Sequence, residues 1–184
     1  MKGCQWIALV ALLVIVGPTQ AQTKKLPSNY KHLKKLQPLV GKFTGESVAV
    51  GTPGIVEKGT KLSWTLTRKW ILNKNAIAQS VILKAGKKTL WRTQGMIGWD
   101  SLNKQIVQGG FDSVGGHGMS TWNWKDGKWY LQDQGAMGPG LKSTSTTIVC
   151  DITKDSHDLK IVSRMVGVNT LPDIGPITMK RAKK

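Results

Sequence analysis

The chain has 184 residues, with 27 Lys or Arg against 10 Asp or Glu, which gives a formal net charge of +17 at pH 7. Most of the basic residues are Lys, a hydrated point charge that reads phosphates less specifically than the planar guanidinium of Arg. The composition therefore favours diffuse attraction to polyanions over a specific phosphate or nucleic-acid site.

Residues 1–21 have the pattern of a secretory signal peptide. A basic start at Lys2 precedes an apolar run over 6–17, Pro18 ends that run, and small residues at Thr19 and Ala21 precede the expected cleavage point. The apolar run is about a dozen residues long, whereas a membrane-spanning helix needs roughly 20. The sequence therefore predicts export to the periplasm or the cell exterior.

The expected mature chain fits one domain, with a basic N-terminal segment over 22–38 and a barrel over 39–182. Ser28 can cap a short helix that runs to about Leu36, and Pro38 ends it. From there on, polarity alternates with a period of two residues between turn residues, which is typical of a sandwich or barrel. The predicted strands are 42–50, 62–68, 75–84, 89–99, 105–112, 117–124, 129–137, 143–152, 158–167 and 176–182.

The links between these strands are too short for parallel pairing, which needs crossovers of about a dozen residues. The links over 51–54, 125–128 and 138–140 contain the Gly and Pro residues that hairpins need. One curved sheet with a single buried face loses its exposed edges when it closes into a barrel. We therefore expect an all-β protein, a monomeric antiparallel barrel of about ten strands with a short N-terminal helix and room for a small ligand. Cys150, the one cysteine left after the leader, is expected in its core.

Several blocks of the sequence resemble one family of exported bacterial proteins. They are 96–100 (MIGWD), 104–106 (KQI), 111–116 (FDSVGG) and 171–176 (LPDIGP), together with Gly118, Trp122, Trp129 and Arg181. The start Leu39-Val-Gly-Lys-Phe43 is similar to the Leu-x-Gly-x-Trp opening of lipocalin-type barrels. The family is a lipocalin-like domain of unknown function, common in planctomycete-type bacteria, often C-terminal to a SnoaL-like domain, and related in fold to nitrobindin-type barrels of the calycin group. The resemblance implies a lipocalin-like barrel and no particular activity, and no SnoaL-like activity is carried over.

Neither a cofactor nor a metal is expected. The resemblance to nitrobindin-type barrels implies haem held by a histidine near the chain end, but 176–182 contain none, and His157 is expected in a polar turn. His32, His117 and His157 fall on separate predicted elements, and the spacing of Cys150 and His157 fits no zinc site.

An enzyme site is an alternative. Residues 112–115 (DSVG) form half of the Gly-x-Ser-x-Gly pattern, but Phe111 stands at the first Gly position and no helix is expected to follow. His117 departs from the family resemblance, in which that position is usually aromatic. Ser113, His117 and Asp112 could serve a hydrolase or isomerase, although hairpin turns are the simpler interpretation of the glycines around them.

Two arginines are candidates for a charged contact inside the barrel. Arg68 continues the apolar face of the strand 62–68, and Arg164 lies on the apolar face of the strand 158–167. A buried charge needs a partner. Asp112 is the expected structural partner, which we favour, and a ligand anion is the functional one.

Tryptophans are usually core residues, but they also make good walls for an apolar ligand. The predicted ligand-binding residues are Arg68, Arg164, Trp64, Trp99, Trp122 and Asp112. The leading hypothesis is a binding protein for a small apolar or weakly acidic molecule outside the cytoplasm, in preference to an enzyme. The third hypothesis is binding of a polyanion or anionic surface through the lysines, without a specific nucleic-acid partner.

Overall fold

A computed structural model describes residues 28–51, 56–138 and 140–183, so the expected signal peptide lies outside the described residues. The helical elements are α1 (Tyr30–Leu33), η1 (Lys34–Leu39) and η2 (Leu72–Lys74). The strands are β1 (Gly41–Val48), β2 (Lys61–Ile71), β3 (Ala76–Ala85), β4 (Lys88–Asp100), β5 (Gln105–Asp112), β6 (His117–Lys125), β7 (Lys128–Ala136), β8 (Lys142–Cys150), β9 (Ser156–Val166), β10 (Asn169–Leu171) and β11 (Ile174–Arg181). None of the described helices is long and apolar enough to cross a membrane.

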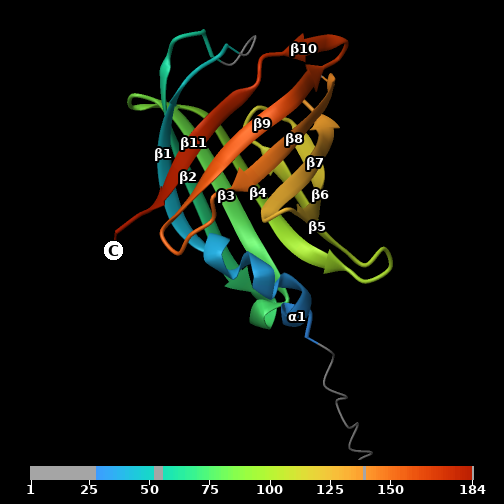
Figure 1. Cartoon of the computed structure of the whole chain (residues 1–184). Helices are drawn as coiled ribbons and strands as arrows, with labels where there is room; N and C mark the ends of the chain where they lie inside the picture. The colour runs from blue at the N-terminus through green and yellow to red at the C-terminus, as the bar shows by residue number, and fades with distance from the viewer. Residues whose placement is uncertain (1–27, 52–55, 139, 184) are drawn as a thin grey trace, which may run out of the picture.

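The strands form a closed antiparallel barrel (Figure 1). The sheet order runs β9-β11-β1-β2-β3-β4-β5-β6-β7-β8, and pairing of β8 with β9 closes the ring of ten strands. The expected all-β antiparallel barrel with a short N-terminal helix is therefore confirmed. The short strand β10 was not expected, and it extends the sheet outside the ring by pairing with β9.

Turn chemistry at the β6–β7 hairpin agrees with the expectation. Asp126 and Gly127 have φ angles of 50° and 75° between the paired ends Lys125 and Lys128. Positive φ at both central residues is what a tight type I′ turn requires, and Asp-Gly is a preferred pair for it.

The N-terminal helical segment closes one end of the barrel (Figure 1). It was expected to stop at Leu36, but it continues as a 3₁₀ helix to Leu39 with Pro38 inside it. This short 3₁₀ helix tolerates Pro38, because the missing N–H of proline removes only one backbone hydrogen bond. The helical segment has three buried leucines, Leu33, Leu36 and Leu39. They pack on a core of strand residues: Ile77, Ile97, Ile106, Trp122, Trp129, Leu131 and Val149. Cys150 is buried at this end, as predicted.

Arg181, at the end of β11, ties the helical segment to the barrel. Its guanidinium donates hydrogen bonds to the carbonyl oxygens of Val40 (2.9 Å), Pro38 (2.9 Å) and Lys154 (2.8 Å). It also lies 4.5 Å from the centre of the Phe43 ring. The closed end therefore depends on a residue almost at the end of the chain.

We expect Arg181→Met to destabilise the protein by about 2 kcal/mol, because charge-assisted hydrogen bonds to three carbonyls are lost at a half-buried site. The measurement is thermal unfolding, in which the melting temperature should fall by about 4–8 °C. Arg92→Met is the matched control, since Arg92 is exposed on β4. Equal melting temperatures for the two variants would contradict the role assigned to Arg181.

Candidate functional site

A cavity of about 430 Å³ lies inside the barrel. Its lining includes residues at the strand ends remote from α1, such as Val48, Ala136 and Val166, so it opens at the end opposite the helical segment. The volume is in the range of small-molecule sites, about 300–1,000 Å³.

The wall formed by β4 to β8 is built in layers, because antiparallel register sets inward residues side by side. The polar row, in register across β5 to β8, comprises Gln108, Ser120, Asp133 and Ser145. The glycine row lies one step nearer the mouth and comprises Gly95, Gly110, Gly118 and Gly135. On the side of the closed end, Ile106, Trp122 and Leu131 form an apolar layer.

Arg68 is the buried cation of the cavity. The alternation of β2 turns it inward after Leu66, and the side chain is 4% exposed. Its Nε donates to Gln79 Oε1 at 2.7 Å, and its Cζ lies 5.4 Å from the centre of the Trp122 ring. Burial lowers the pKa of Arg68 to about 9.

The Nη1 atom of Arg68 has no hydrogen-bond partner among the described residues, nor does the buried Gln108 Oε1. The expected pairing of Arg68 with Asp112 is absent from the described part of the chain. Register explains this, because Asp112 lies opposite Thr93 near the mouth, whereas Arg68 lies opposite Gln79. Arg68 therefore brings an uncompensated charge to the cavity.

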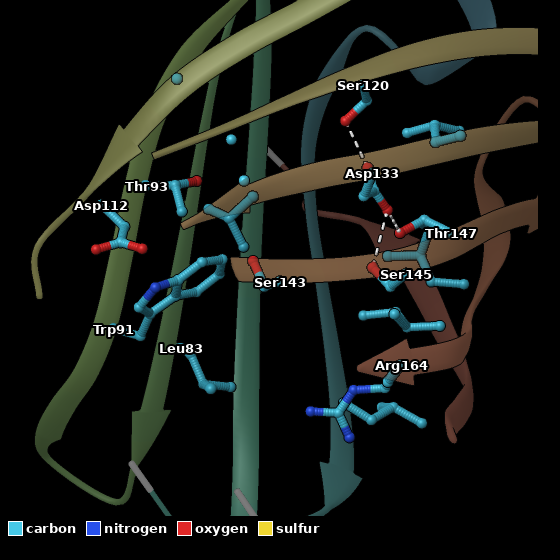
Figure 2. A pocket seen from close by; sticks show the side chains of 18 of the residues that line it. Leu83, Trp91, Thr93, Asp112, Ser120, Asp133, Ser143, Ser145, Thr147 and Arg164 are labelled. Carbon is cyan, nitrogen blue, oxygen red and sulfur yellow. Dashed lines mark hydrogen bonds between the residues drawn. The ribbon is translucent and has the colours of Figure 1, made fainter. Parts of the chain in front are cut away.

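Asp133 is the half-buried acid of the polar row (Figure 2). Its carboxylate accepts hydrogen bonds from the hydroxyls of Ser120 (2.5 Å), Thr147 (2.6 Å) and Ser145 (3.3 Å). Burial raises the pKa of Asp133, and the three hydroxyl donors only partly oppose that effect. No ion pair joins Asp133 to Arg68 in the described part of the chain, so Asp133 does not compensate the Arg68 charge.

Arg164 also reaches the cavity, from β9 (Figure 2), but its guanidinium already bonds to the protein. Its Nη1 donates to the Pro172 carbonyl at 2.6 Å. Burial lowers the pKa of Arg164, and the nearby Asp173 charge acts in the opposite direction. Asp173 also accepts from the backbone of Ser163, so Arg164 serves to attach the 172–173 segment to β9.

The tryptophans predicted as ligand walls lie in two places, the cavity and the closed end of the barrel. Trp64 lines the cavity, and so does Trp91, which the sequence analysis did not single out (Figure 2). Trp122 is packed in the closed end with Trp129. Trp99 stacks on His32 with ring centres 4.0 Å apart.

The three residues of the alternative enzyme site make separate turn contacts. Asp112 Oδ1 accepts from the backbone N–H groups of Val114 (2.9 Å) and Gly116 (2.8 Å), and Ser113 Oγ accepts from the Arg92 N–H at 3.0 Å. His117 is exposed beside Phe111, with ring centres 6.2 Å apart. No hydrogen bond joins Ser113, His117 and Asp112 in the described part of the chain.

The expected position of His157 in a polar turn is wrong. β9 begins at Ser156, which makes His157 an inward strand residue opposite Met179, only 1% exposed. Its ring meets Phe43 edge to face, and neither ring nitrogen has a hydrogen-bond partner among the described residues. Burial first, and then the charges of Arg68 and Arg181, lower the pKa of His157 to about 3. It does not line the cavity.

Comparison with known proteins finds a structure of similar fold but indicates no activity. The sequence matches no family model and no curated protein. The structure is similar to Rv2717c from M. tuberculosis, with a TM-score of 0.56 and 13% identity, over 82% of this chain and 97% of that one. The resemblance to an exported lipocalin-like family therefore stays a prediction.

Proposed function

We propose that the protein is an exported binding protein of the lipocalin-like kind, which holds a small apolar molecule with a weakly acidic group inside the barrel. The observation that supports this most is Arg68, a buried guanidinium on the cavity wall with its Nη1 atom unpartnered. Export rests on the sequence pattern of residues 1–21.

A ligand carboxylate would compensate the positive charge of Arg68. Gln79 is neutral, so it satisfies one N–H of Arg68 and leaves the charge uncompensated. A carboxylate is the natural partner of a guanidinium, because it accepts two parallel hydrogen bonds. It would also raise the pKa of Arg68 towards its ordinary value.

The rest of the ligand is expected to be apolar. Apart from its polar groups, the cavity is lined by side chains such as Leu62, Trp64, Leu66, Leu83 and Trp91. Burial of ligand hydrocarbon against such walls contributes a favourable free energy of about 25 cal/mol per Å².

The test is a comparison of anthracene-2-carboxylate with its neutral amide, anthracene-2-carboxamide, followed by tryptophan fluorescence. We expect the acid to bind about tenfold more tightly or better, because only the acid compensates the Arg68 charge. Equal affinities for the two probes would contradict the proposal.

The salt dependence distinguishes cavity binding from attraction to the surface lysines. Between about 50 and 200 mM salt, cavity binding of the acid should change little, whereas attraction of the acid to exposed lysines is weakened because salt screens those charges. A steep fall would favour the lysine surface and count against the cavity.

A further inference from the structure

The glycine row makes part of the cavity wall bare of side chains. Four adjacent strands, β4 to β7, each place a glycine at the same level. Neighbouring strands lie about 4.8 Å apart, so the bare strip extends over roughly 14 Å of wall. At one end it continues in register to Gln79 and then Arg68. The charged anchor thus lies at the end of the strip.

Close backbone approach explains only part of this row. A Cβ added at Gly95, Gly110 or Gly135 would come within 2.3, 2.5 or 2.1 Å of a backbone oxygen of the neighbouring strand. A Cβ at Gly118 would meet its nearest atom, Gln134 O, at an ordinary 3.5 Å. Backbone packing therefore leaves room for a side chain at Gly118, and the position is bare.

The facing wall is apolar. In the ring order, β4 to β7 are separated from β11, β1 and β2 by β3 on one side and by β8 and β9 on the other, so these two groups of strands face each other. The facing strands contribute a cluster of buried apolar side chains: Phe43, Leu62, Trp64, Leu66, Ile177 and Met179. Of these, Leu62, Trp64, Leu66 and Met179 line the cavity, so the glycine row faces hydrocarbon across it.

We infer that the ligand is a flat aromatic acid, whose ring face lies on the glycine row and whose carboxylate points to Arg68. This rests on the proposed function and adds the shape of the ligand to it. A ring system makes full van der Waals contact with a bare strip, whereas a globular hydrocarbon touches it at few atoms. The unpartnered Arg68 Nη1 at the end of the strip fixes the acid group.

The first arm of the test compares two acids of equal carbon number in their hydrocarbon parts, anthracene-2-carboxylate and the cage acid diamantane-1-carboxylate. We expect the flat acid to bind about tenfold more tightly or better. Equal affinities would overturn the inference about shape.

The second arm places a side chain on the strip. Gly118→Val should weaken binding of the flat acid by about tenfold or more, because its methyl groups occupy the space of the ring. Gly109→Val is the matched control, a strand glycine whose register partners Met96 and Met119 are exposed on the outer face. Its added Cβ would meet nothing closer than 3.9 Å. If Gly118→Val does not fold, Gly118→Ala gives the same readout with a smaller group.

The outcomes separate the two proposals. Wild-type affinity in a folded Gly118 variant would overturn the flat-ligand inference. Equal binding of the two acids, together with a preference for acid over amide, would leave the proposed function standing and remove the inference. Failure of both acids to bind would remove both proposals.

Discussion

Arg68→Met is expected to weaken binding of anthracene-2-carboxylate by about a hundredfold or more and to make the free protein more stable. Burial lowers the pKa of Arg68 to about 9, which corresponds to a cost of burying the charge on the order of 5 kcal/mol. Leaving the Gln79 oxygen without its donor costs about 1–3 kcal/mol, which is less. The melting temperature of the variant should therefore rise by about 5 °C or more.

Arg164→Met is the matched comparison, because Arg164 reaches the same cavity but bonds to Pro172. This variant should lose about 1–3 kcal/mol of stability, since its hydrogen bond to a carbonyl is removed. A fall in melting temperature for Arg68→Met, with affinity per folded molecule unchanged, would show that Arg68 is structural and would remove the charged-contact proposal.

The fold could be predicted from the sequence because its main signals are local. The period-two alternation over 62–68 predicts which side chains of β2 are buried, and the same alternation turns Arg68 inward. Asp126 and Gly127 specify their turn by their own backbone preferences. β10 escaped prediction because three residues are too few for a period, and its pairing with β9 depends on tertiary contact.

The site was predicted less well because it depends on register between strands. The alternation of Trp129, Leu131 and Asp133 could have placed Asp133 inward, since all three lie on one face of β7. Which groups it meets is set by pairing with β6 and β8, which a single sequence does not show. The same is true of the glycine row, whose members are spread over 95–135 and look separately like bulges or turns.

His157 shows how a small shift in a strand boundary changes the chemistry of a residue. The strand was expected to begin at 158, but β9 begins at Ser156, and this shift moves the imidazole from solvent to the core. In the core it lies against Phe43 with neither nitrogen hydrogen-bonded in the described part of the chain. The folded protein therefore holds His157 in its neutral form.

We expect this histidine to make the protein acid-sensitive. The unfolded chain takes up a proton on His157 below about pH 6.5, whereas the folded chain does so only near its lowered pKa of about 3. Between these values the unfolded state binds more protons, so stability falls as the pH falls, by about 1.4 kcal/mol per pH unit. From pH 7 to about pH 4 the loss from this residue is about 3 kcal/mol, or about 6–12 °C in melting temperature.

The measurement is the melting temperature of His157→Phe and wild type as a function of pH. Phenylalanine keeps a ring against Phe43 and cannot take up a proton, so the variant should lack this part of the acid-induced fall. The exposed His117 provides the control, and His117→Gln should keep the wild-type pH dependence. If His157→Phe and wild type lost stability in parallel between about pH 6.5 and pH 4, protonation of another group would have to cause the fall. The buried imidazole would then have no part in it.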